Sequence, residues 1–211
     1  MAAFVIPNPM KRIFLAYLPQ LDIETLKKLI LPQLNKNEIE TFHLFKHPSR
    51  RKEWLAIRWL LKNHLGFIPK IHYKENGKPF LKSLSSEISI SHSRDFAAVC
   101  ISNYPCAVDI DNWQRNYTSV ASRYLSPQEY NAYSGEQKKL ALAWMAKEAT
   151  YKIIGQSQVI FASQISVSIP QEINNFGYFY GTFFGQKQTA KLIFTYYKLD
   201  KNFLVIAEYE N

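Results

Sequence analysis

The stretch AVDID at residues 107–111 places Asp109 and Asp111 two positions apart on a short run of β-type sequence. Successive side chains of a strand point to opposite faces, so these two carboxylates are predicted to share one face. Further along, WMAKEATYK has the pattern of a helix, and Glu148 and Lys152 within it are four residues apart, on one helical face. We therefore expect three acids and one base to converge on one cleft.

Three carboxylates in one place are typical ligands of a hard divalent ion such as Mg²⁺, which completes its shell with water and substrate phosphates. Taken singly, each part has a simpler interpretation. An isolated Asp-x-Asp is more often a solvated strand end, and Glu148 with Lys152 alone is an ordinary surface ion pair. The full set of four residues is what indicates phosphate chemistry.

Composition limits the classes of protein that the chain can represent. Its 211 residues are 47% hydrophobic and carry a formal net charge of +9, which predicts a core large enough for independent folding and an attraction to anionic partners. Two cysteines, Cys100 and Cys106, are too few for a disulfide scaffold and lack metal-ligand spacing, so we expect a cytoplasmic protein.

Membrane insertion and secretion are not expected from the sequence. The apolar patch near the N-terminus has no basic region before it, so a signal peptide is not predicted. The longest apolar helix pattern, WLAIRWLLKNHLGF, carries Arg58 and Lys62 on a helical period, which is typical of an amphipathic helix rather than a membrane span.

The order of patterns predicts helices followed by strands, twice over. Ser49 is expected to cap the third helix and Ser126 a later one, and Gly155 is expected to end a long helix. The fold class is therefore α+β, with a division into 1–104 and 105–211. Helices are expected at 21–30, 37–45, 49–65, 117–125, 126–133 and 136–154, and strands at 12–18, 71–75, 78–81, 86–93, 96–102, 106–110, 164–170, 176–185, 190–199 and 203–210.

Four short segments stand in a fixed order along the chain: GKPFL at 77–81, ISHS at 90–93, VDID at 108–111 and WMAKEATYK at 144–152. Together they resemble the 4'-phosphopantetheinyl transferases, specifically the surfactin-synthetase-type (Sfp-like) class. RYLSPQEY at 123–130 is similar to a further segment of that family, and the likeness spans about residues 50–155.

The resemblance implies a fold of two pseudo-symmetric halves, each a small, mostly antiparallel sheet packed with helices, with the active site in the cleft between them. It also implies a reaction, the transfer of the phosphopantetheine arm of coenzyme A to a serine of an acyl or peptidyl carrier protein. That reaction requires Mg²⁺ and releases adenosine 3',5'-bisphosphate. We expect a monomer, because a chain with two such halves can build its site within one molecule.

By motif match, the resemblance implies that Asp109, Asp111 and Glu148 are the metal ligands. Glu148, or a metal-bound water beside it, is the expected proton acceptor for the attacking serine. Lys152 and His92 are expected to neutralise the charge that the ion leaves, and either can assist the departing phosphate.

The same motif match implies residues that bind coenzyme A. The first group, expected to line the site, is Gly77, Lys78 and Pro79. Ser91 and His92 are expected at the phosphates and Lys152 at the pyrophosphate. Arg51 is the expected contact of the 3'-phosphate, with Arg50 or Lys52 as alternatives.

Two positions differ from the family pattern. Ala107 stands where glycine is more frequent, and a strand accepts alanine because its φ is negative. Asp111 stands where glutamate is more frequent, and its shorter side chain leaves open whether it binds the ion directly or through water. This difference also keeps open a related protein that lost activity and acts only as a binding partner.

Positive charge near the metal strand predicts a docking surface for an acidic carrier protein. Some of four basic residues are expected to form it, with apolar Tyr124 or Leu125 nearby: Arg115, Arg123, Lys138 and Lys139. A basic nucleic-acid-binding module is the alternative from another class, since the chain is rich in aromatic residues that can stack on bases. We expect no nucleic-acid partner, because clustered carboxylates repel phosphate unless a cation lies between them. The sequence does not indicate which carrier protein is modified, nor whether the donor is free or acylated coenzyme A.

Overall fold

The structure, a computed structural model, describes residues 3–6, 11–186 and 188–210. Its backbone divides into two compact units. The first unit comprises Met1–Tyr73 and Pro79–Asn103, and the second comprises Lys74–Lys78 and Tyr104–Asn211. The division expected between residues 104 and 105 stays a prediction, and the short turn segment Lys74–Lys78 groups with the later part of the chain.

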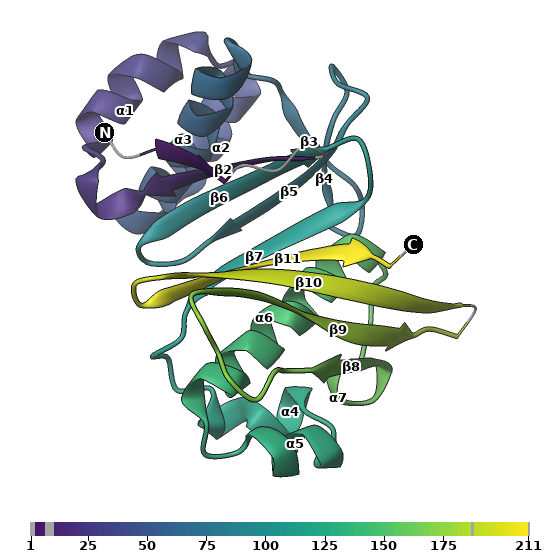
Figure 1. Cartoon of the computed structure of the whole chain (residues 1–211). Coiled ribbons are helices and arrows are strands. Elements are labelled where there is room, and N and C mark those ends of the chain that lie inside the picture. The colour runs from purple at the N-terminus through teal and green to yellow at the C-terminus, as the bar shows by residue number, and fades with distance from the viewer. Residues whose placement is uncertain (1–2, 7–10, 187, 211) are drawn as a thin grey trace. The chain divides into compact units, whose positions relative to one another are not determined.

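Within the described residues, the first unit is a six-stranded antiparallel sheet packed with helices (Figure 1). The strand order is β1-β2-β6-β5-β4-β3. The strands are β1 Ala3–Ile6, β2 Lys11–Tyr17, β3 Ile71–Tyr73, β4 Pro79–Leu81, β5 Glu87–His92 and β6 Phe96–Ser102. The helices are α1 Ile23–Ile30, α2 Lys36–Leu44 and α3 Pro48–Leu65, with short 3₁₀ turns η1 Leu18–Gln20 and η2 Leu31–Gln33.

The long helix α3 supplies much of the first core. Leu55 and Leu60 of α3 are fully buried and belong to one hydrophobic cluster with Val99 of β6. The expectation that Ser49 caps this helix is wrong. The helix begins one residue earlier, at Pro48, whose fixed φ suits the first helical position, and His47 takes the cap without a side-chain hydrogen bond.

The second unit contains, among its described residues, a five-stranded antiparallel sheet in the order β7-β11-β10-β9-β8. The strands are β7 Cys106–Asn112, β8 Ile165–Ser168, β9 Phe176–Phe184, β10 Thr189–Leu199 and β11 Asn202–Tyr209. The helical elements are η3 Thr118–Val120, α4 Ala121–Tyr124, α5 Pro127–Tyr133, α6 Gln137–Ile154 and α7 Phe161–Gln164.

Strand β7, which carries the AVDID sequence, pairs with β11, the last strand of the chain. Asp109 is paired with Val205, and Asp111 with Phe203. Helix α6 packs against both strands (Figure 1). This packing places the carboxylates of β7 within reach of side chains on α6.

Local signals explain the helices around the candidate site. Ser126 and Glu129 form a capping box at the start of α5, as the SPQE sequence predicts. Helix α6 ends at Gly155, whose φ of +63° lies in the left-handed region that favours glycine.

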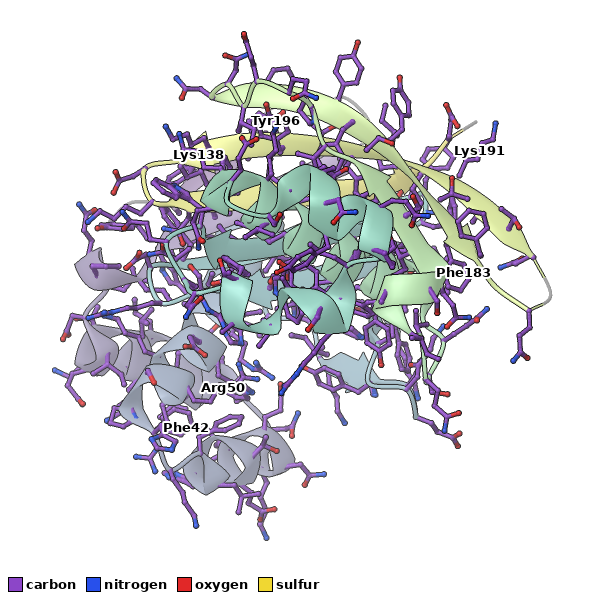
Figure 2. The ribbon with its side chains drawn as sticks, turned by 90° about the horizontal axis from the view of Figure 1, so that it is seen from below. Phe42, Arg50, Lys138, Phe183, Lys191 and Tyr196 are labelled. Carbon is purple, nitrogen blue, oxygen red and sulfur yellow. The ribbon has the colours of Figure 1, made fainter. Side chains whose placement is uncertain are left out.

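Phe183 and Tyr196 of the second core and Phe42 of the first are labelled in Figure 2.

The α+β fold class predicted from the sequence is confirmed: each unit is an antiparallel sheet packed with helices. Cys100 and Cys106 are both buried. In the portion of the chain that the structure covers, every helix is too short or too polar to cross a bilayer.

Candidate active site in the second unit

Asp109 on β7 and Lys152 on α6 form a direct ion pair. The Lys152 ammonium donates to Asp109 Oδ1 at 2.7 Å and to the backbone oxygen of Val108 at 3.0 Å. Asp109 is buried, with 7% of its surface exposed, and Lys152 offsets part of the cost of burying its carboxylate. The packing of α6 on β7 thus holds one strand carboxylate beside a cation on the last turn of the helix.

Asp111, two residues further along β7, is held by the turn that follows the strand. Its Oδ1 accepts the backbone N–H of Asn112 at 2.8 Å, and its Oδ2 accepts from the guanidinium of Arg115. Burial raises the pKa of Asp111, and the charge of Asp109 acts in the same direction, against the Asn112 and Arg115 contacts. Asp111 is therefore a buried carboxylate next to a second one.

Glu148 on α6 is electrostatically coupled to both strand carboxylates. Its pKa is raised from 4.5 to about 7, first by burial and then by the charges of Asp109 and Asp111, with the charge of Lys152 acting in the opposite direction. Burial is the larger cause, and the two like charges add to it because they act on Glu148 at short range. Asp109, Asp111 and Glu148 therefore form one acidic group within the second unit, which we call the acid cluster.

The acid cluster fits a hard divalent cation in its donor chemistry. All three members offer carboxylate oxygens, the ligand type that Mg²⁺ prefers, and the mutual repulsion that raises the Glu148 pKa is relieved by a cation among them. Across the described residues, no three or more His, Cys, Asp or Glu side chains are already arranged to hold a metal ion. In this structure the cations at the two strand carboxylates are Lys152 and Arg115.

A cavity of about 610 Å³ opens beside Glu148, lined by residues of the second unit. Trp144 and Phe161 contribute apolar walls, and Arg115 and Arg123 contribute positive charge. Its volume is in the range of small-molecule sites. Glu148 is thus accessible from a partly apolar, basic cavity.

The turn that carries Gly77 and Lys78 lies against the end of α6. Gly77 has a φ of +81°, and the side-chain amide of Asn76 donates to the backbone oxygen of Gly155. The N–H of Lys78 donates to Asn76 Oδ1 at 3.1 Å. The structure therefore groups Lys78 with the C-terminal end of α6, the end that carries Lys152.

The remaining expected coenzyme A residues belong to the first unit: Pro79 begins β4, and Ser91 and His92 end β5. Ser91 is buried, whereas the side chain of His92 is 37% exposed.

Two neighbouring arginines on α3 differ in their surroundings. Arg50, labelled in Figure 2, contacts the His92 ring, and Glu53 lies 3.2 Å from Arg50 and 3.3 Å from His92 Nδ1. Arg51 instead donates to the backbone oxygens of Phe45 at 2.8 Å and His43 at 3.4 Å. Of the two, Arg50 is therefore the one beside the expected phosphate contact His92.

Comparison with known proteins agrees with this geometry. Residues 105–203 match the 4'-phosphopantetheinyl transferase superfamily. The chain is 30% identical over 135 residues to the 4'-phosphopantetheinyl transferase AcpT of Escherichia coli K12, covering 56% of this chain and 69% of that protein. The chain belongs to the 4'-phosphopantetheinyl transferase superfamily.

Other members of the superfamily match shorter stretches. The AcpT of Salmonella typhi is 32% identical over 117 residues, which is 51% of this chain and 61% of that protein. The 4'-phosphopantetheinyl transferase gsp of Aneurinibacillus migulanus is 29% identical over 91 residues, which is 41% of this chain and 38% of that protein. The chain thus spans about three fifths of the length of the Salmonella relative.

Part of the docking surface expected for this superfamily member is wrong. Tyr124 and Leu125 are buried in the second core, and Lys139 is also buried, paired with Glu136 at 2.7 Å. Aromatic and aliphatic side chains at these positions complete the packing under α6, so they are not available to a partner. Arg115 remains largely exposed, at 63% of its side chain.

One buried ion pair was not anticipated from the sequence. Lys147, the residue before Glu148, is fully buried and donates to Glu129 Oε2 at 2.7 Å and to the backbone oxygens of Ile165 at 2.6 Å and Phe161 at 3.1 Å. This contact joins α5, α6, α7 and β8. The sequence did contain a signal for this pair, because Lys147 lies on the apolar face of the predicted helix, directly before the candidate ligand Glu148.

Proposed function

We propose that this protein transfers the 4'-phosphopantetheine group of coenzyme A to a serine of an apo acyl or peptidyl carrier protein, releasing adenosine 3',5'-bisphosphate. In this reaction a bond forms between the serine oxygen and the β-phosphorus of the pyrophosphate, and the bond from that phosphorus to the bridging oxygen breaks. The observation that carries the proposal is the acid cluster of β7 and α6, in a chain of this superfamily.

We assign the magnesium ligands to Asp109, Asp111 and Glu148. When bound, Mg²⁺ would neutralise negative charge on the pyrophosphate oxygens, which is the main obstacle to attack by a hydroxyl group. The fit rests on the carboxylate donors and on their mutual repulsion.

Glu148 is the proposed acceptor of the serine proton. In the metal-free protein, burial beside two carboxylates raises the pKa of Glu148 to about 7, so its surroundings favour binding of a proton. The cavity beside Glu148 supplies a path for the serine to approach.

Lys152 is the proposed cation at the pyrophosphate. Its ammonium already lies 2.7 Å from Asp109, so it is fixed within the acid cluster and can donate to a phosphate oxygen there.

The coenzyme A contacts that we propose are Gly77, Lys78, Pro79, Ser91, His92 and either Arg51 or Arg50. Support for Lys78 comes from its grouping with the end of α6, and support for Arg50 comes from its contact with His92.

The net charge of +9 favours encounter with an acidic carrier protein. We assign the protein to the surfactin-synthetase-type class, acting as a cytoplasmic monomer.

The test is incubation of the protein with coenzyme A, Mg²⁺ and a panel of apo-carrier proteins, followed by intact-mass spectrometry. The expected result is a mass gain of one phosphopantetheine on at least one carrier. The gain should be absent with a chelator, with Glu148→Gln, and with a carrier whose acceptor serine is replaced by alanine. Mg²⁺-dependent coenzyme A binding without any mass gain across the panel would instead indicate a relative that lacks activity.

A further inference from the structure

Each carboxylate of strand β7 is held by a cation from within the chain. Lys152 pairs with Asp109 at 2.7 Å, and Arg115 pairs with Asp111. The two pairs differ in burial, because the Lys152 side chain is 27% exposed and the Arg115 side chain is 63% exposed. Arg115 is thus the more solvated of the two cations that face the acid cluster.

The backbone of Arg115 is fixed, although its side chain is exposed. The side-chain amide of Gln137, at the start of α6, donates to the backbone oxygens of Trp113 and Arg115. The N–H of Trp113 donates to the backbone oxygen of Lys201 at 3.0 Å, and the N–H of Tyr117 donates to that of Arg115 at 2.9 Å. The contact with Asp111 is therefore a consequence of a rigid turn, and only the side chain needs to move to break it.

A guanidinium and a divalent ion cannot share Asp111 without repulsion. Oδ1 already accepts the Asn112 N–H, and Oδ2 accepts from Arg115. An ion that binds Asp111 through Oδ2 from the side that the guanidinium now occupies therefore displaces the Arg115 side chain.

We propose that Arg115 is a built-in competitor for the metal at Asp111, which holds this carboxylate in the metal-free protein and is displaced when a divalent cation binds. The inference rests on the proposed function, because it takes the acid cluster as the metal site. It also assigns direct ligation to Asp111, since a water-mediated contact would let Arg115 stay.

The structure provides a place for the displaced side chain. Arg115 lines the cavity beside Glu148 together with Arg123. Because the Arg115 side chain is largely exposed, its pair with Asp111 contributes a modest free energy, so the exchange lowers metal affinity by a modest factor, about two- to fivefold. After the exchange, two guanidinium groups face the cavity.

The test compares metal affinity in Arg115→Gln and in a matched control, Arg123→Gln. Arg123 lines the same cavity, and in the described chain no ion pair is recorded for it. Mg²⁺ affinity is measured by calorimetry. Mn²⁺ affinity is obtained from the concentration of free Mn²⁺, measured by electron paramagnetic resonance. Arg115→Gln should bind both ions about two- to fivefold more tightly than the unaltered protein, whereas Arg123→Gln and Arg115→Lys should bind them with unaltered affinity.

A second background identifies the carboxylate involved. In Asp111→Asn protein, adding Arg115→Gln should change metal affinity no further, because the shared partner is gone. Circular dichroism and thermal unfolding verify that each variant is folded.

Equal or weaker metal binding by Arg115→Gln overturns the inference, as does the same tightening in Arg123→Gln or in the Asp111→Asn background. Those results leave the proposed function standing if the unaltered protein binds Mg²⁺ and modifies a carrier. An unaltered protein that binds neither Mg²⁺ nor Mn²⁺ overturns the metal assignment itself, and the inference with it.

Discussion

The ammonium of Lys152 on α6 lies 2.7 Å from Oδ1 of Asp109 on β7 and also donates to the backbone of that strand. This one side chain links the helix that carries Glu148 to the strand that carries the other two carboxylates.

Replacing Lys152 with methionine should affect both folding and transfer. The buried Asp109 would lose a charged partner, which we expect to lower the free energy of unfolding by about 1–3 kcal/mol. Loss of the cation at the pyrophosphate should lower kcat for carrier modification by at least about tenfold. Urea unfolding and the mass-based assay measure the two effects, and Lys152→Arg should restore stability more than turnover. Normal turnover of Lys152→Met would contradict the assigned role.

Glu148 should make the stability of the metal-free protein depend on pH. Its pKa is raised from 4.5 to about 7 on folding, by burial first and then by Asp109, so the folded state holds this proton more tightly than the unfolded state. The stabilisation is complete below pH 4.5 and is lost as the pH rises through 7. Above pH 7, the free energy of unfolding of Glu148→Gln should therefore exceed that of the unaltered protein by up to roughly 3 kcal/mol. The variant should accordingly unfold at a higher urea concentration. Unfolding in chelator across this range checks the prediction, and a difference that grows toward low pH would contradict it.

Metal affinity should rise with pH through the same interval. Glu148 must lose its proton to act as a ligand, so Mg²⁺ binding measured by calorimetry should tighten between about pH 5.5 and 8. The carboxylate-to-amide change at Glu148 should weaken binding and flatten this pH dependence. A steep dependence that persists in Glu148→Gln would assign the titrating group elsewhere.

The buried pair of Lys147 and Glu129 should contribute to stability in a way that a surface lysine does not. Lys147→Met leaves Glu129 buried and charged without its cation, which we expect to cost about 3–5 kcal/mol. Adding Glu129→Gln removes the uncompensated charge and should recover part of that loss. Lys201→Met, at an exposed position, is the control and should change stability by less than about 0.5 kcal/mol. Equal effects of Lys147→Met and the control would refute the prediction.

Arg50 and Arg51 of α3 should have different roles, Arg50 in binding coenzyme A and Arg51 in stability. Arg50 contacts His92, whereas Arg51 holds the backbone oxygens of Phe45 and His43. We expect Arg50→Gln to raise the KM for coenzyme A with little change in stability. The difference in KM between coenzyme A and its 3'-dephospho form should become smaller in this variant. Arg51→Gln should instead lower stability by about 1–2 kcal/mol. The reverse pattern would return the 3'-phosphate contact to Arg51.

The local signals of the sequence were sufficient for most of the secondary structure. Period and capping patterns predicted α5 from Ser126, the end of α6 at Gly155 and the strand that carries Asp109. Local pattern cannot show which strands become neighbours, so the pairing of β7 with β11 was not predictable. Ser49 was misassigned because a serine and a proline both favour the start of a helix, and the proline prevailed.

The candidate site was partly predictable from the sequence, because local periodicity also places side chains on common faces. Strand and helix periods are enough to place Asp109 with Asp111, and Glu148 with Lys152, on common faces. The contact of Arg115 with Asp111 depends on the fold of a turn that Gln137 fixes from another element. Long-range contacts of that kind are set by tertiary packing, which spacing along the chain does not encode.

The pairing of β7 with β11 also has a consequence during translation. In the order of the second sheet, β7 has one strand neighbour, and that neighbour, Asn202–Tyr209, is synthesised about ninety residues after Asp111. A nascent chain still lacking that segment has no strand to pair with β7, so Asp109 and Asp111 take their final alignment only after β11 has emerged from the ribosome. Release of the chain before that point would leave the acid cluster unformed.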